Sequence, residues 1–221
     1  LIVSTNTMNE LLLIKKWLRY DKELRKDETL KKKLKPGFRA LFYGPPGTGK
    51  TLTATLLGKE FEKDVYRIDL SMVISKYIGE TEKNLSTVFE TAANKDWILF
   101  FDEADALFGK RTNISNAHDR YANQEVSYLL QRVEDHDGLV ILATNFKNNI
   151  DSAFMRRFHT SVYFQMPTVS ERKLLWQSTL PQYPPLSEQV SVEELAQKFE
   201  LSGAGILNVI QLAGIRALSE D

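Results

Sequence analysis

Residues 44–51, GPPGTGKT, combine flexible backbone with a lysine and a threonine. They follow a short apolar run at residues 39–43 and precede a helical pattern that extends to Glu60. Only glycine-rich backbone can bring successive N–H groups close to a triphosphate without side-chain collision, and the N-terminus of the following helix adds partial positive charge. The pattern G-x-x-x-x-G-K-[ST] between a strand and a helix therefore predicts a P-loop.

The predicted P-loop gives its polar side chains separate roles. Lys50 is expected to reach the outer phosphates, and the Thr51 hydroxyl is placed to bind Mg²⁺. The alternative is a simple Gly/Pro turn before a helix, which the complete motif in its strand and helix setting disfavours. The sequence thus predicts ATP or ADP and Mg²⁺ as cofactors, with nucleotide contacts from Gly44, Pro45, Pro46, Gly47, Thr48, Gly49, Lys50, Thr51 and Leu52.

Two other apolar runs end in polar side chains. Asp102 and Glu103 follow WILFF, and open α/β sheets bind ligands at the carboxyl ends of their strands. In this Walker B arrangement Asp102 would hold Mg²⁺ through water, and Glu103 would polarise the water that attacks the γ-phosphate. Asn145 ends the run GLVILAT and would hydrogen-bond the γ-phosphate or orient the water. Taken singly, a solvent-facing acidic strand end and a turn asparagine are the alternatives.

A parallel sheet would bring these groups to one edge. After Pro36, helical stretches alternate with five short apolar runs, of which four are typical of buried strands: RALFY, DVYRIDL, WILFFD, GLVILAT and TSVYF. This alternation predicts an α/β fold, a P-loop NTPase αβα sandwich with a parallel sheet. From Pro167 onward the patterns are helical, which predicts a small all-helical lid domain after the sheet.

Three segments are expected along the chain: an N-terminal helical lead-in at residues 1–35, the nucleotide-binding domain at 36–165 and the lid at 166–221. Ser170 and Ser191 precede glutamates, as helix N-caps do. The chain starts without methionine and stops within a helical pattern, so we expect a piece of a longer protein.

The composition limits the classes of function. In 221 residues, 29 basic side chains balance 29 acidic ones, so no net charge favours nucleic acid or an anionic membrane. The absence of cysteine excludes disulfides and thiolate metal sites, and the three histidines lack metal-ligand spacing. No apolar run approaches the ~20 residues of a membrane span. We therefore expect a cytoplasmic protein without a membrane span.

Taken together, these motifs resemble an AAA+ ATPase module of the protein-remodelling branch, over residues 36–219. The segments SKYIGETEKNL (75–85), DSAFMRRF (151–158) and LSGAGI (201–206) match the same family. The stretch HDRYANQEVSYLLQRVE is similar to a bacterial-type group, some members of which accompany contractile injection systems. The resemblance implies that a homo-oligomeric ring, expected to be a hexamer, hydrolyses ATP to remodel, unfold or disassemble a protein client.

The resemblance also implies contacts with the client. Tyr77, Ile78 and Gly79 match an aromatic–hydrophobic–Gly triplet on a loop that lines the pore of such rings. The flat apolar ring of Tyr77 would grip an extended polypeptide through non-directional contact. A partly buried residue at a helix start is the alternative. The polar stretch at residues 107–126 is expected to hold a second pore-facing loop, with a solvated loop as its alternative.

The remaining implied site residues lie near the nucleotide. Arg156 and Arg157 resemble arginines that the family presents to the neighbouring subunit's nucleotide, and the sequence leaves open which one is the finger. The usual RPGRFD pattern is absent, and His159 replaces an acidic residue. Gly203 and Ala204 match a lid segment beside the adenine and are small enough for close approach of the base. Two surface arginines and a simple helix start are the alternatives.

Other classes of function remain open at this point. A cis-acting P-loop NTPase or kinase would explain Lys50, Thr51 and Asp102 but not Tyr77 or the paired arginines. A nucleotide-regulated assembly scaffold and an AAA+ machine acting on nucleic acid are the further alternatives. Stimulation of ATP hydrolysis by unfolded polypeptide, rather than by DNA, would distinguish them.

Overall fold

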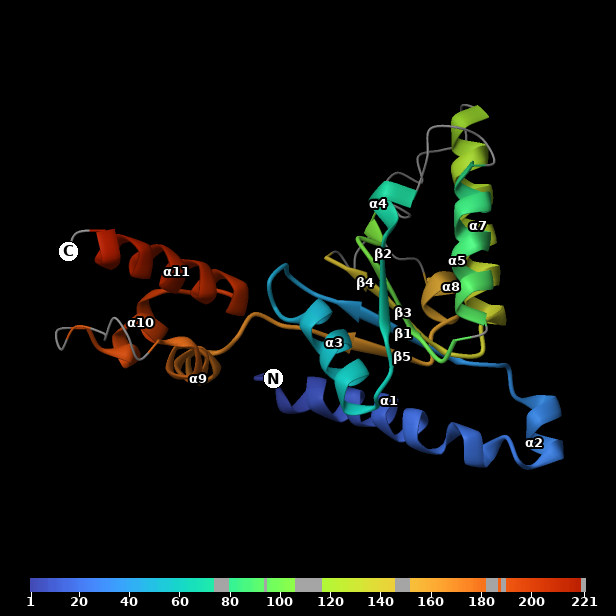
Figure 1. Ribbon diagram of the computed structural model, residues 1–221, viewed down its shortest axis with the longest axis horizontal. Helices are drawn as coiled ribbons and strands as arrows, with labels where there is room; N and C mark the ends of the chain where they lie inside the picture. The colour runs from blue at the N-terminus through green and yellow to red at the C-terminus, as the bar shows by residue number, and fades with distance from the viewer. Residues whose placement is uncertain are drawn as a thin grey trace.

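The computed structural model describes residues 1–73, 80–93, 95–105, 117–145, 152–181, 187 and 190–219. At its centre lies a five-stranded parallel sheet in the order β2-β3-β4-β1-β5 (Figure 1). The strands are β1 (Phe38–Tyr43), β2 (Val65–Asp69), β3 (Ile98–Asp102), β4 (Leu139–Thr144) and β5 (Thr160–Tyr163). The predicted parallel α/β fold is confirmed.

The central strands bury side chains on both faces, as expected when helices cover both sides of a sheet. Alternate residues of β3 and β4 belong to two separate hydrophobic clusters: Leu99 and Phe101 lie in one, Ile98 and Phe100 in the other. All four are fully buried. The alternation follows from the two-residue period of a strand, and it makes the protein a three-layer αβα sandwich.

Helices α1 (Thr5–Leu24) and α3 (Lys50–Glu60) cover one face of the sheet, and α5 (Glu80–Ala93) and α7 (Ala117–Asp135) cover the other (Figure 1). The described ranges of this part of the chain also contain the short helices α2 (Glu28–Lys33), α4 (Leu70–Val73) and α8 (Ser152–Met155). Because α7 begins at Ala117, residues 117–126 of the stretch expected to hold a second pore-facing loop are helical, and residues 106–116 lie outside the described ranges.

Helix α1 packs on the strands that carry the P-loop. Its Leu11 and Ile14 are buried in the same cluster as β1 and β4. The Thr7 hydroxyl donates to the Tyr163 carbonyl oxygen at 2.7 Å, and the Thr160 hydroxyl donates to Glu10. The predicted lead-in therefore contributes to the core beside β5, while the division of the chain at residue 35 stays a prediction.

The C-terminal part is helical, as predicted, and consists of α9 (Val169–Thr179), α10 (Val192–Lys198) and α11 (Gly203–Ser219). These helices have their own small cluster around Trp176, Ala196 and Ile206. In Figure 1 they lie to one side of the sheet, joined to it through the segment that follows β5. We refer to α9–α11 as the lid.

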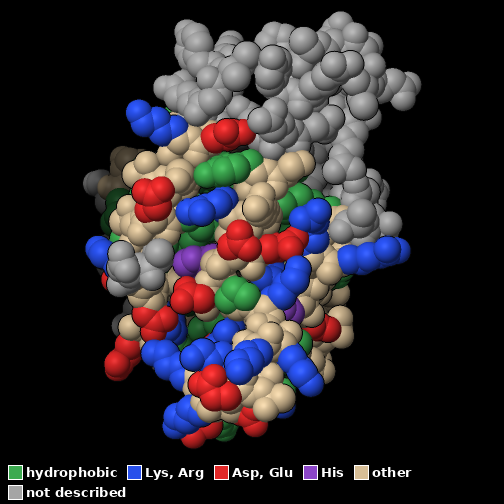
Figure 2. Space-filling model, turned by 90° about the vertical axis from the view of Figure 1, so that its right-hand side faces the viewer, with side chains coloured by type: hydrophobic (Ala, Val, Ile, Leu, Met, Phe, Trp, Pro, Cys, Tyr) green, Lys and Arg blue, Asp and Glu red, His purple; other side chains and the backbone are tan. Residues whose placement is uncertain are grey.

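Figure 2 shows the face that includes α2, with basic and acidic side chains interspersed over it. Basic side chains gather toward the lower end of this view. The last turn of α2 contains Lys31, Lys32 and Lys33. The mixture agrees with the balanced charge of the sequence. Within the described ranges, no helix combines the length and the apolar character that crossing a membrane requires.

Candidate nucleotide-binding site

The P-loop needs glycine because its backbone adopts positive φ values that other residues rarely take. Gly44 has a φ of 140°, and a Cβ there would lie 2.0 Å from the Phe164 carbonyl oxygen. Gly47 has a φ of 74°, and its Cβ would lie 2.5 Å from Ser202 Oγ in the lid. The loop therefore passes between β5 and the lid with room for backbone alone.

Helix α3 starts directly from this loop. Gly49, its N-cap, has a φ of 102° and offers no side-chain oxygen to the first N–H groups of the helix. Helix N-termini have unpaired N–H groups and partial positive charge, and both favour an anion. The arrangement is that of a phosphate-binding turn.

The Lys50 ammonium is buried beside the loop and is fully hydrogen-bonded. It donates to the carbonyl oxygens of Gly44 and Pro45 at 2.6 and 3.0 Å, and to Asn145 Oδ1 at 3.0 Å. Burial lowers the pKa of Lys50, while the negative charges of Asp102 and Asp105 act in the opposite direction. All three protons of the ammonium are therefore used in hydrogen bonds within the protein.

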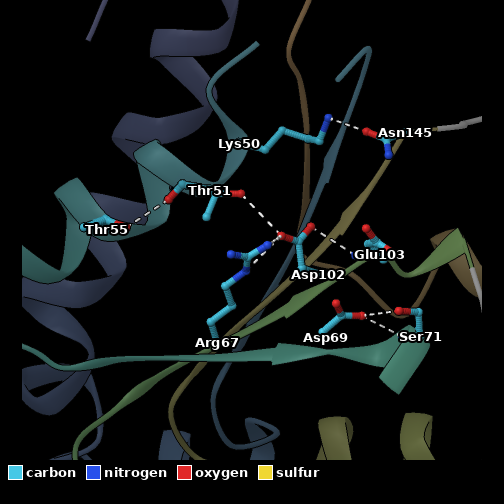
Figure 3. Close-up of polar contacts among 9 residues, drawn as sticks. All are labelled: Lys50, Thr51, Thr55, Arg67, Asp69, Ser71, Asp102, Glu103 and Asn145. Atoms are coloured by element: carbon cyan, nitrogen blue, oxygen red, sulfur yellow. Dashed lines mark hydrogen bonds and ion pairs between the residues drawn. The ribbon is translucent and has the colours of Figure 1, made fainter. Parts of the chain in front are cut away.

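Thr51, Asp102 and Glu103 meet at the edge of the sheet (Figure 3). The Thr51 hydroxyl donates to Asp102 Oδ2 at 3.4 Å, and the backbone N–H of Glu103 donates to Asp102 Oδ1 at 3.0 Å. Glu103 is exposed and has a φ of 53°, which is uncommon for a residue other than glycine. Unusual backbone of this kind occurs at functional sites, where the surrounding structure holds it in place.

The oxygens of Thr51 and Asp102 suit Mg²⁺, which is usually held by one or two carboxylates together with phosphate oxygens and water. Among the described residues, no three His, Asp or Glu side chains form a metal site of their own. The protein therefore offers the partial ligand set that a nucleotide-bound Mg²⁺ requires.

Asp105 is a site residue that the sequence analysis did not assign. One of its oxygens accepts a hydrogen bond from the Thr144 hydroxyl, and Oδ2 accepts one from the Asn145 backbone N–H at 3.1 Å. It thereby fixes the end of β4 beside Lys50. Its place three residues after Asp102, where the chain leaves β3, is the signal that could have revealed it.

A cavity of about 560 Å³ joins the P-loop to the lid. Its lining includes residues 46–52 of the P-loop, Asp102, Asn145, and Gly203 and Ala204 of the lid. The Ala204 N–H donates to the Gly47 carbonyl oxygen at 3.2 Å, so lid and loop are in direct contact. Residues 1–4 also line the cavity, and no motif in the sequence indicated this.

The two predicted arginines differ in their surroundings. Arg157 forms an ion pair with Glu134, which also accepts from Lys35 Nζ at 3.0 Å. Arg156 is exposed, and no ion pair joins it to another described residue. Neither of these arginines lines the cavity of its own chain. The predicted client-contacting residues Tyr77, Ile78 and Gly79 lie outside the described residues.

Glu134 carries the charge that fixes Arg157. Burial acts to raise the pKa of Glu134, but the hydrogen bonds and positive charges of Lys35 and Arg157 outweigh it, so that this pKa lies below its ordinary value. The carboxylate is therefore ionised and able to hold Arg157 at neutral pH.

Comparison with known proteins places the site in a family. Residues 40–166, more than half of the chain, match the model of the ATPase family associated with various cellular activities (AAA). Cell division protein C of Sulfolobus acidocaldarius is 33% identical over 190 residues, which cover 81% of this chain and 50% of that protein. A cell division cycle protein 48 homolog of Archaeoglobus fulgidus is 35% identical over 193 residues, covering 85% of this chain and 26% of that protein.

A solved structure agrees with the sequence relatives. The AAA domain of FIGL-1 in complex with ADP has a TM-score of 0.66 and 25% sequence identity, covering 82% of this chain and 62% of that one. The match spans half or less of the full length of Cell division protein C and of the cell division cycle protein 48 homolog.

Proposed function

Because the chain belongs to the AAA family of ATPases, we propose that it binds ATP between the P-loop and the lid and hydrolyses it. The convergence of Lys50, Thr51, Asp102 and Asn145 on one cavity carries the proposal, with Glu103 joined to Asp102 through its backbone N–H. Lys50 and Thr51 begin α3, Asp102 ends β3, and Asn145 directly follows β4; the parallel sheet brings the carboxyl ends of β3 and β4 to the same side.

The proposed reaction gives each side chain a separate task. The Lys50 ammonium would exchange its carbonyl and amide partners for phosphate oxygens. Thr51 and Asp102 would hold Mg²⁺, which supplies positive charge to the phosphates. Glu103, exposed at the strand end, would polarise the attacking water, and Asn145 would orient that water or bind the γ-phosphate.

We propose further that the active unit is a ring in which Arg156 or Arg157 serves the neighbouring subunit's nucleotide. Both arginines lie outside their own chain's cavity, which supports action in trans. A head-to-tail interface of this kind closes into a ring when its rotation allows, and a hexamer is our expectation. Arg156 is favoured as the finger because it is exposed and forms no ion pair with another described residue, whereas Arg157 is paired with Glu134.

The work done by the ring is proposed to be remodelling of a protein client in the cytoplasm, with Tyr77, Ile78 and Gly79 as the client contact. The proposal rests on the sequence resemblance. The association with contractile injection systems stays a prediction.

Two variants test the proposed chemistry. Lys50→Ala should abolish ATP binding, because it removes the charge that the phosphates require. Glu103→Gln should retain binding and block turnover, because it removes a charge needed only to polarise water. Nucleotide affinity and single-turnover hydrolysis are measured for both, and equal loss of binding in the two variants would contradict the assignment.

The client class needs a separate measurement. Unfolded polypeptide should stimulate ATP hydrolysis by the assembled protein, whereas DNA should not. Tyr77→Ala should spare basal hydrolysis and remove the stimulation. Stimulation by DNA alone would instead favour a machine that acts on nucleic acid.

A further inference from the structure

The carboxylate proposed to hold Mg²⁺ is already paired with a cation from the same chain. Arg67, on β2, donates to Asp102 Oδ2 from Nε at 3.1 Å and from Nη2 at 2.7 Å (Figure 3). Both bonds end on the oxygen that also accepts from the Thr51 hydroxyl. The guanidinium thus lies beside the pair of oxygens proposed as magnesium ligands.

The register of the sheet explains how Arg67 reaches this place. Arg67 is the Cα partner of Phe100 in the neighbouring strand, and Asp102 lies two residues further along on the same side of β3. Phe100 belongs to the cluster on the α3 side of the sheet. A long side chain from position 67 therefore extends along the α3 side toward the strand end and the first turn of α3.

Asp102 depends on the ion pair more strongly than Arg67 does. The Asp102 side chain is only 15% exposed, whereas that of Arg67 is 58% exposed. A largely buried carboxylate is costly without a cation, while a well-exposed guanidinium is readily hydrated. Asp102 therefore needs a positive partner at all times, but Arg67 can leave at small cost.

There is room for Arg67 to leave. A cavity of about 330 Å³ lies between α3 and β2 and is lined by Arg67 together with Thr55, Lys59 and Asp64. Because Lys59 and Lys63 also line this cavity, the displaced guanidinium would turn toward solvent, to which it is already 58% exposed. Arg67 can thus move away from Asp102 without disturbing the buried core.

We propose that Arg67 is a resident counter-cation that Mg²⁺ must displace from Asp102, so that Arg67 sets the magnesium affinity of the nucleotide site. The inference rests on the proposed Mg²⁺ site. A guanidinium and a divalent ion compete for the same carboxylate oxygen and repel one another, so a smaller positive charge at position 67 favours the metal. The pairing also keeps Asp102 neutralised until metal and nucleotide arrive together.

The test measures metal binding and requires no turnover. A fluorescent ADP analogue is held at fixed concentration with the protein, and Mg²⁺ is titrated to obtain the midpoint of the fluorescence change. The neutral variants Arg67→Gln and Arg67→Met should lower the midpoint roughly three- to tenfold, since one unit charge near the ion is removed. Arg67→Lys keeps the charge but replaces the planar guanidinium, with its two donors to Asp102, by a compact ammonium. Its midpoint should lie between those of the neutral variants and the wild type.

Lys59→Gln is the matched control, because it removes a positive charge from the same cavity without a bond to Asp102. Its midpoint should stay within about twofold of the wild type. Binding of the ADP analogue in EDTA reports whether each variant keeps a folded pocket, and a variant that fails this check is replaced by the other neutral one.

The outcomes separate the inference from the proposal on which it rests. If wild-type binding shows no dependence on Mg²⁺, the proposed metal site itself is wrong. If the wild type depends on Mg²⁺ but the neutral variants have its midpoint, Arg67 does not compete with the metal. A higher midpoint in those variants would also overturn the inference, because it would mean that Arg67 supports the metal site.

Discussion

Asp105 accepts the backbone N–H of Asn145 at 3.1 Å, which connects the segment three residues beyond the end of β3 to the residue that follows β4. Its second oxygen accepts from the Thr144 hydroxyl. Asn145 Oδ1 in turn accepts from Lys50. A single carboxylate thus positions the amide that faces the P-loop lysine, although Asp105 itself is separate from that contact.

Asp105→Asn should therefore slow hydrolysis while leaving nucleotide affinity nearly unchanged. An amide has one oxygen where the carboxylate uses two, so one of the two contacts with β4 is lost. A small misplacement of a group at the reacting centre can reduce turnover by roughly 10- to 100-fold. The measurement is kcat together with the Kd of ADP, and Asp135→Asn at the exposed end of α7 is the control. Unchanged kcat would show that Asn145 does not need this support.

The case of Asp105 shows what the sequence could and could not reveal. Lys50, Thr51 and Asp102 were predicted because each belongs to a motif whose spacing follows from phosphate and metal chemistry. Asp105 acts through the neighbouring strand, and that pairing is a product of the sheet. Arg67 was missed for the same reason, since its partner lies on β3.

Of the two serines predicted to be helix N-caps, one has this role and the other does not. Ser191 caps α10, as predicted, by accepting from the Glu194 N–H at 3.4 Å. Ser170 was predicted as a cap, but the N-cap of α9 is Thr168, which forms a capping box with Glu171. The Thr-x-x-Glu spacing is the stronger pattern, and it places the helix start two residues earlier. The hydrophobic periodicity located α9 correctly, whereas its first residue is set by the reciprocal hydrogen bonds of Thr168 and Glu171.

His136 gives the fold a dependence on pH. Its side chain is 7% exposed, and within the described part of the chain its Nε2 has no hydrogen-bond partner. Burial lowers the pKa of His136 and Arg132 lowers it further, while Asp137 opposes them. Because the folded pKa lies below the unfolded value of about 6.5, the unfolded chain binds more protons as the pH falls through that value. Acid therefore destabilises the native state.

We expect the free energy of unfolding to decrease between pH 7.5 and pH 5.5 in the wild type, and to decrease less in His136→Gln. Urea unfolding at both pH values gives the comparison. Partial burial also lowers the pKa of His159, so that residue contributes in the same direction in both proteins. The same decrease in the wild type and the variant would mean that His136 has no part in it.

The contact between lid and P-loop predicts an effect on nucleotide affinity. Ala204 is exposed, lines the cavity and donates its N–H to the Gly47 carbonyl oxygen. Ala204→Leu should fill space beside the loop and weaken ADP binding by about tenfold, as expected from an overpacking cost of about 1.4 kcal/mol. Ala213→Leu, also exposed on α11, is the control and should bind ADP normally. If both variants bind like the wild type, the lid residue does not approach the nucleotide.

Arg156 and Arg157 should differ when each is replaced alone. Arg157→Ala removes the partner of Glu134, whereas Arg156 has no ion pair with another described residue. We expect Arg157→Ala to lower the free energy of unfolding by about 0.5 kcal/mol, the usual size of a partly exposed pair, and Arg156→Ala to leave it unchanged. Thermal or urea unfolding measures this. If Arg156 is the finger, Arg156→Ala should also cause the larger loss of ATP hydrolysis.

Mixing of inactive proteins tests whether the arginines act in trans. A protomer that lacks both arginines keeps its own pocket but fails to complete its neighbour's, while Lys50→Ala loses its pocket and can still donate arginines. Each is expected to be inactive alone. When they are mixed at concentrations where rings assemble, part of the ATPase activity should return, because some interfaces then combine an intact nucleotide pocket with a neighbour that still has its arginines. A cis-acting enzyme predicts no recovery at any ratio, so a flat activity curve, with assembly confirmed by sedimentation, would exclude the trans mechanism.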